Sequence, residues 1–227
     1  MLKWLRHNGC PWDRRTCAAA AGGGHLETLK WLHRNGCPWD DVAFVSDACS
    51  SAAEGGHLAV LRWLRELNCP WNEATCAYAA KGGHLAVLQW ARKHDAPWTE
   101  ATCESAAGSG HLAVLRWARQ NDCPWSEDTC ARAAGGGHLA VLQWARGHNC
   151  PWDASTCLSA ARGGHLLVLR WAREAQGCPW DEDHVRASAA EGGHQGMIAW
   201  LDGRKHGEGR AGSILALKNR TRRDSQL

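Results

Sequence analysis

The chain has 227 residues, of which 44% are hydrophobic and 22% are charged, and its formal net charge is +3 at pH 7. This composition is ordinary for a folded soluble protein, and no apolar run approaches the roughly 20 residues of a membrane-spanning helix. The aromatic residues are unusual, because the sequence has 15 Trp but only one Tyr and one Phe. A repeating motif therefore sets the composition.

The twelve cysteines raise the question of a disulfide framework. Residues 1–6 lack the apolar core of a secretory leader. We therefore expect the thiols to be reduced, and the protein to be intracellular and cytoplasmic.

The chain starts within a repeat. Residues 1–10 match only the second half of the unit described below, with Trp4 at the position of Trp90. Since the ends of a solenoid need a polar outer face, we expect the natural protein to extend further upstream.

Each unit from residue 10 onward opens with Cys-Pro-Trp, or Ala-Pro-Trp in one unit, followed by a residue that can cap a helix. The side-chain oxygen of Asp, Asn, Ser or Thr accepts a hydrogen bond from a first-turn amide, so these residues predict the start of a first helix. The seven predicted N-caps are Asp13, Asp40, Asn72, Thr99, Ser126, Asp153 and Asp181.

A Gly-Gly pair follows about nine residues later and should end the first helix, because glycine adopts the left-handed cap without strain. A second helix then begins at a histidine and carries apolar residues at helical spacing, as at Leu85, Leu88 and Ala91. The Gly-His pair recurs at intervals of 32, 27, 27, 27, 27 and 29 residues, which is typical of a repeat protein. Its histidines are His25, His57, His84, His111, His138, His165 and His194.

Two units depart from this period. Residues 37–57 carry five extra residues, which should lengthen the first helix or bulge its loop, and residues 177–194 gain one residue in each half. We assign residues 1–201 to an all-α solenoid of helix-turn-helix pairs, with one half repeat and about seven pairs. Residues 202–227 contain seven Lys/Arg and three Asp/Glu and should form a basic, disordered C-terminal tail.

The unit resembles the ankyrin repeat. Residues 79–88 read Ala-Ala-Lys-Gly-Gly-His-Leu-Ala-Val-Leu, which is similar to the ankyrin pattern Ala-Ala-x-x-Gly-His-x-x-Val-Val. The Thr-Pro-Leu-His signature is absent, with Cys76 at the place of its leucine and Ala77 at the place of its histidine. Six residues are also missing where ankyrin repeats carry a β-hairpin finger. The resemblance implies an ankyrin-type solenoid that acts as a protein-binding scaffold.

Three recurring residue types could carry chemistry. No nucleophile or paired carboxylate recurs beside the histidines, and the ankyrin resemblance implies a structural role for them. The Cys-x6-Cys spacing suits no compact zinc motif, and Ala96 replaces the first cysteine in one unit, as expected for a small buried side chain. The tryptophans could stack bases, but packed helices lie about 8–10 Å apart, too far for continuous stacking. We therefore predict no enzyme, no metal and no cofactor.

One row of arginines at the same place in the second helix leaves two hypotheses open. Such a row can track phosphates, so nucleic-acid or anionic-surface binding through it and the basic tail is the alternative function. A cation near each helix C-terminus is the simpler explanation, because the repeat body is not net basic. The row consists of Arg6, Arg65, Arg92, Arg119, Arg146 and Arg173.

The function we predict is a non-catalytic scaffold that presents an extended repeat surface to another protein. We expect a monomer, and we do not expect nucleic acid as the main partner. Positions shared by all units build the framework, so specificity should fall to first-helix positions that differ between units. Tyr78, Leu158 and the arginines are the best anchors by residue type. The predicted contact residues are Tyr78, Lys81, Glu104, Ser105, Arg132, Leu158, Ser159 and Arg162.

Overall fold

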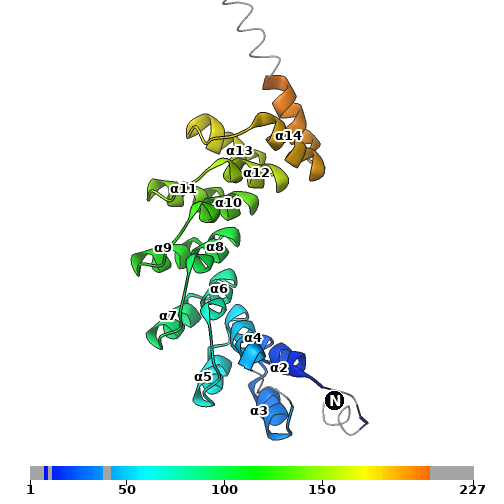
Figure 1. Ribbon diagram of the computed structural model, residues 1–227, viewed down its shortest axis with the longest axis vertical. Helices are drawn as coiled ribbons and strands as arrows, with labels where there is room; N and C mark the ends of the chain where they lie inside the picture. The colour runs from blue at the N-terminus through cyan, green and yellow to red at the C-terminus, as the bar shows by residue number, and fades with distance from the viewer. Residues whose placement is uncertain (1–7, 10–11, 38–41, 205–227) are drawn as a thin grey trace, which may run out of the picture.

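The computed structural model describes residues 8–9, 12–37 and 42–204. This part of the chain is helical, contains no β-strand, and stacks helix-turn-helix pairs into an elongated, curved array (Figure 1). None of its helices is long and apolar enough to cross a membrane. The all-α solenoid is therefore confirmed. Residues 202–204, which the sequence assigned to a disordered tail, continue the last helix instead. Residues 1–7 of the predicted half repeat and residues 205–227 of the predicted tail lie outside the described residues.

The described part contains seven helix pairs. The first helices are α2 (Arg14–Gly22), α4 (Val42–Glu54), α6 (Glu73–Lys81), α8 (Glu100–Gly108), α10 (Glu127–Gly135), α12 (Ala154–Arg162) and α14 (Glu182–Glu191). The second helices are α3 (Leu26–Arg34), α5 (Leu58–Glu66), α7 (Leu85–Lys93), α9 (Leu112–Gln120), α11 (Leu139–Gly147), α13 (Leu166–Arg170) with the π-helix η1 (Trp171–Ala175), and helical residues 195–204.

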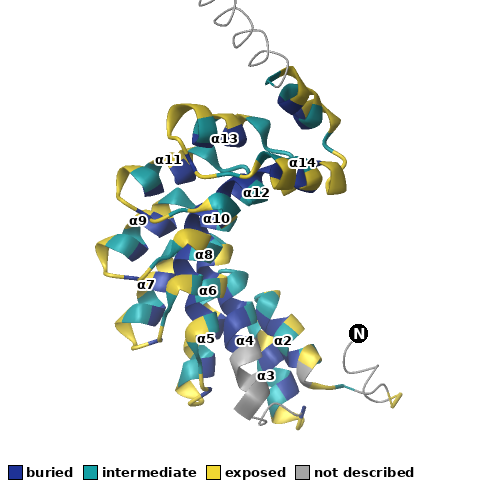
Figure 2. Ribbon diagram, turned by 45° about the horizontal axis from the view of Figure 1, so that its top comes forward, coloured by how far each residue is buried: buried dark blue, intermediate teal, exposed yellow. Residues whose placement is uncertain are grey.

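The pairs form two layers with different spacing. Successive first helices contact one another along the array, whereas the second helices are spread apart on the other side (Figure 1). The first helices bury small residues such as Ala79 and Ala80, so their axes can approach closely. The second helices bury Leu and Val and carry the bulkier Trp. The array therefore curves, and the buried residues run between the two layers (Figure 2).

Four of the predicted N-caps form the expected hydrogen bonds. The side chains of Asp13, Asn72, Asp153 and Asp181 accept from first-turn amides. Thr99 and Ser126 hold the predicted N-cap position with the extended cap backbone, but their side chains accept no cap hydrogen bond. Asp40 lies outside the described residues.

This difference predicts two unequal mutations. Asp153→Ala should lower the free energy of unfolding by about 1 kcal/mol, because the amide of Ser155 loses its 2.9 Å bond to Oδ1. Ser126→Ala should change it by less than about 0.3 kcal/mol, because no cap bond is lost. Urea denaturation of both variants checks this, and equal effects would contradict it.

The two irregular units lengthen their helices. Helix α4 has 13 residues, against nine in α6, so four of the five extra residues lengthen the first helix, which is one of the two arrangements that the sequence left open. The extra residue of the sixth second helix is absorbed in η1, where α13 widens into a π-helix. The last first helix, α14, has ten residues. Insertions thus enter as helix and leave the stacking intact.

The Gly-Gly-His turn joins the two helices of a unit, and its histidine contacts the turn of the preceding unit. Its first glycine is right-handed, as in Gly82 with φ −77°, and only the second is left-handed, as in Gly83 with φ +75°. A Cβ on Gly83 would lie 2.7 Å from the ring of His111 in the next unit. Nε2 of that ring lies 3.0 Å from the carbonyl oxygen of Lys81 and donates to it. His57, His138 and His194 make the same bond at 2.9, 3.1 and 2.9 Å. The histidines therefore have the structural role that the ankyrin resemblance implied.

Candidate functional site

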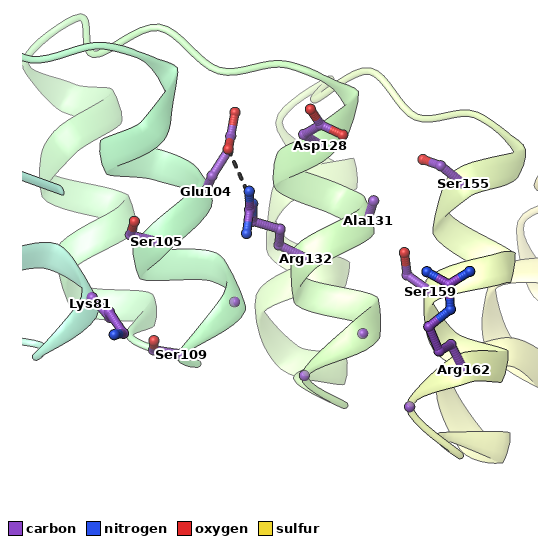
Figure 3. A pocket seen from close by; sticks show the side chains of 14 residues that line it. Lys81, Glu104, Ser105, Ser109, Asp128, Ala131, Arg132, Ser155, Ser159 and Arg162 are labelled. Atoms are coloured by element: carbon purple, nitrogen blue, oxygen red, sulfur yellow. Dashed lines mark hydrogen bonds and ion pairs between the residues drawn. The ribbon is translucent and has the colours of Figure 1, made fainter. Parts of the chain in front are cut away.

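Six of the eight predicted contact residues line one groove on the first-helix layer (Figure 3). The groove has a volume of about 670 Å³ and crosses α6, α8, α10 and α12. The six residues are Lys81, Glu104, Ser105, Arg132, Ser159 and Arg162. The structure thus brings together residues that the sequence spreads over about 80 positions.

Two glycines make this surface hollow. Gly108 and Gly135 occupy the position that carries Lys81 in α6 and Arg162 in α12. A Cβ on Gly108 would lie 3.3 Å from Cβ of Arg132, and one on Gly135 would lie 3.4 Å from Cβ of Ser159. The missing side chains therefore leave a depression between a lysine at one end and an arginine at the other.

Ion pairs between successive first helices fix three of the groove's charges. Nζ of Lys81 lies 2.8 Å from Oε1 of Glu54. Nε of Arg132 lies 3.1 Å from Oε2 of Glu104, the pair joined by the dashed line in Figure 3. The hydrogen bond and charge of Glu54 raise the pKa of Lys81. Because Lys81, Glu54 and Arg132 are largely exposed, the pairs add little stability. Their main effect is to orient the side chains.

Asp128 and Arg162 are the charged groove residues that form no ion pair within the described part of the chain. They lie toward opposite ends of the groove's helices, with Asp128 in the first turn of α10 and Arg162 in the last turn of α12 (Figure 3). The hydroxyls lining the groove belong to Ser105, Ser109, Ser155 and Ser159. The groove can therefore accept a cation beside Asp128, an anion beside Arg162 and polar groups beside the serines.

Tyr78 and Leu158 are not part of this groove. Tyr78 is 39% exposed on α6, and Nζ of Lys81 lies 5.5 Å from its ring centroid. Leu158 is half-buried and packs against the core. Both positions vary between units, but variability alone does not show which way a side chain points.

Sequence comparison missed eight lining residues. Gly108 and Gly135, which make the groove hollow, occupy the same variable position as Lys81 and Arg162. The sequence pattern could have indicated them, but a prediction of contact side chains does not include glycine, which has none. The missed residues are Gly108, Ser109, Asp128, Ala131, Gly135, Gly136, Ser155 and Gly163.

The arginine row has partners within the chain. Arg92 donates from Nη1 to the carbonyl oxygen of Ala96, and its guanidinium lies 4.2 Å from the ring centroid of Trp98. Arg65, Arg119 and Arg146 repeat both contacts, with 4.3 Å to the following tryptophan in each case. Trp98 also meets Trp117 edge to face at 5.9 Å. These arginines therefore hold the short link between units in place of a finger.

The cysteines form a feature that sequence reasoning missed. The cysteine of one first helix faces the cysteine that opens the next unit, with 3.2 Å between the sulfurs of Cys17 and Cys37. Ala96 stands in place of the cysteine that opens its unit, and Sγ of Cys76 contacts the carbonyl oxygen of Ala96. The eleven described cysteines are buried and form no disulfide bond. No group of three His, Cys, Asp or Glu in the described ranges could hold a metal ion.

Burial of these thiols predicts a pH effect. Burial raises the pKa of Cys76 from 9.0 to about 12, so the native state holds its proton more tightly than the unfolded state does. Its contribution to stability should be complete below pH 9.0 and be lost as pH rises towards 12. We expect the urea midpoint to fall over this range, and to fall less steeply in Cys76→Ala. Identical slopes in the two proteins would contradict this expectation.

Comparisons with known proteins agree with this geometry at the level of the fold. No protein-family model and no curated protein matches the chain. Among solved structures, it is similar to the crystal structure of the human ASB11 ankyrin repeat domain, with a TM-score of 0.54 and 16% sequence identity. The similarity covers 70% of this chain and 83% of that one. The chain therefore has an ankyrin-repeat fold.

Proposed function

Because the chain has the ankyrin-repeat fold, we propose that it is a non-catalytic scaffold that binds another protein through the first-helix groove. One observation carries this proposal. Residues that differ between units gather in one depression across four consecutive first helices, while the residues common to all units are buried or link the units. A surface of this kind separates binding specificity from the framework that keeps the fold.

The charges of the groove indicate the chemistry of the partner. Asp128 suits a lysine or arginine of the partner, and Arg162 suits an aspartate or glutamate. The serines can bond the partner's backbone or polar side chains. Lys81 and Arg132 already have carboxylate partners, so they should contribute less binding energy than Arg162.

Filling the groove tests this proposal. Gly135→Arg adds a side chain to its floor, and the 3.4 Å approach of the new Cβ to Ser159 is ordinary contact. Gly22→Arg is the matched control, because Gly22 holds the equivalent position in α2, outside the groove. We expect affinity capture from cell lysate to recover partner proteins with the wild type and the control but not with Gly135→Arg. Equal recovery by all three would refute the groove as the binding surface.

Nucleic-acid or anionic-surface binding remains the alternative function. Nuclease treatment during the same capture separates the two, because protein partners should survive it and moderate salt. Binding to nucleic acid would fall steeply as salt rises, because counterions are released when phosphates are neutralised.

A further inference from the structure

The two layers of the solenoid carry opposite charge. Within the described residues, the first-helix segments 12–24, 42–56, 69–83, 96–110, 123–137, 150–164 and 177–193 contain six Lys/Arg and thirteen Asp/Glu, whereas the six second-helix segments contain eleven Lys/Arg and five Asp/Glu. The second-helix segments counted are 25–36, 57–68, 84–95, 111–122, 138–149 and 165–176. The repeat body is close to neutral as a whole, but its second-helix layer, here called the basic side, has a net positive charge and its first-helix layer a net negative charge.

A pocket on the basic side lies between α9 and α11. Its volume is about 390 Å³, and its lining contains no carboxylate. Arg116 lies 5.8 Å from the ring centroid of Trp144, and His148 stacks on the same ring at 4.3 Å. Arg119 lies 4.3 Å over Trp125. The lining residues are Arg116, Arg119, Gln120, Trp125, Trp144 and His148.

The two arginines of this pocket are oriented by aromatic rings and have no acidic partner. Within the described residues, Arg116 and Arg119 form no ion pair. Nδ1 of His148 lies 2.8 Å from the carbonyl oxygen of Trp144, which fixes the ring against the tryptophan. Cations that are already oriented lose little conformational entropy when an anion binds.

One other unit shows a carboxylate beside the corresponding arginine. The arginine position of Arg116 is also occupied by Arg62 and Arg170, each 54 residues away. Four residues later these two units carry Glu66 and Glu174, whereas the pocket has Gln120. Oε2 of Glu174 lies 3.5 Å from Nε of Arg170, and its Oε1 lies 3.3 Å from Nη1 of Arg204. A carboxylate of the chain itself thus bridges two arginines where the pocket has none.

We propose that the pocket between α9 and α11 binds a carboxylate from an acidic segment of a partner protein. The partner's carboxylate takes the place that Glu174 occupies beside Arg170. A nucleic acid that followed the second helices would meet Glu66 on one side and Glu174 on the other, so a local acidic segment fits this surface better. The site lies in the second-helix layer, and its existence does not depend on the first-helix groove.

Three substitutions in the full chain test this site, with a fluorescein-labelled hexaglutamate peptide as probe and a hexaglutamine peptide as its neutral counterpart. Arg116→Gln removes the central cation, and Gln120→Glu supplies the internal carboxylate found in the other two units. Each should weaken peptide binding, measured by fluorescence anisotropy, by about tenfold. Arg170→Gln is the matched control and should leave the affinity unchanged, because Glu174 already pairs with Arg170.

The outcomes separate this site from general charge attraction. Equal weakening by Arg170→Gln, or no effect of Gln120→Glu, would overturn the proposal, because attraction to the basic side as a whole would then explain binding. A single-stranded oligonucleotide of equal charge that bound more tightly than the peptide would assign the surface to nucleic acid instead. No binding at millimolar peptide would also overturn it. The first-helix variant Gly135→Arg should not affect this assay, so failure of the groove and failure of this pocket are distinguishable.

Discussion

Gly110→Ala is expected to lower the free energy of unfolding by about 2–4 kcal/mol, although it adds one methyl group. Gly110 has φ +80°, a conformation that costs an alanine about 1–2 kcal/mol. The new Cβ would also lie 2.6 Å from Nδ1 of His138. The ring would have to move, and its 3.1 Å bond to the carbonyl oxygen of Gly108 would weaken. The substitution therefore damages the contact between two units.

Urea denaturation followed by circular dichroism measures this effect, and Gly147→Ala is the matched control. Gly147 ends helix α11 and does not have a positive φ, and a Cβ added to it would meet no neighbouring atom within 4 Å. Alanine there should leave stability unchanged or raise it by up to about 1 kcal/mol. Similar losses from the two substitutions would show that general loss of glycine, rather than the crowded turn, determines stability.

Trp98→Ala is expected to lower the free energy of unfolding by about 2–3 kcal/mol. Trp98 is half-buried and packs against the core at the link between two units. Its removal loses the edge-to-face contact with Trp117 and the cation–π contact with Arg92. Arg92 would keep its bond to the carbonyl oxygen of Ala96 but lose the ring that covers it. The link between helices α7 and α8 should become the weakest point of the array.

Trp98→Phe is the control for this second prediction. It keeps an aromatic ring against Trp117 and Arg92, and the loss should be about 1 kcal/mol. Hydrogen exchange should show faster exchange of amides in α7 and α8 in the alanine variant, while α12 stays protected. Uniformly faster exchange along the whole array would contradict a local role for the link.

Both predictions concern contacts between units, as expected for a solenoid. Each unit contacts only its neighbours, so stability depends on the interfaces as much as on the helices themselves. Two devices connect the units here. On one edge a histidine of one unit lies against a glycine of the preceding unit, and on the other edge an arginine and two tryptophans hold the Cys-Pro-Trp link. The second device stands where the finger is missing.

The sequence by itself determined the repeat period and the helical class, whereas the structure decided that the extra residues after Cys37 lengthen α4. The period and the helical class follow from local sequence patterns that recur in every unit. Apolar residues at helical spacing, Asp or Asn at helix starts and Gly-Gly at helix ends depend on neighbours within a few residues. The structural role of the histidines was expected from the ankyrin resemblance, and the sequence alone did not show their partner in the preceding unit.

Only the tertiary structure decided which variable residues share a surface. Lys81 and Arg162 enclose one groove, while Tyr78 and Leu158 fall outside it, because the direction of each side chain depends on how the first helices stack. The pairing of Cys17 with Cys37 and the ring under each arginine are likewise contacts between units. Cys17 and Cys37 are 20 positions apart, and the geometry of contacts between units is set by the spacing of the helices, which small and large side chains fix together.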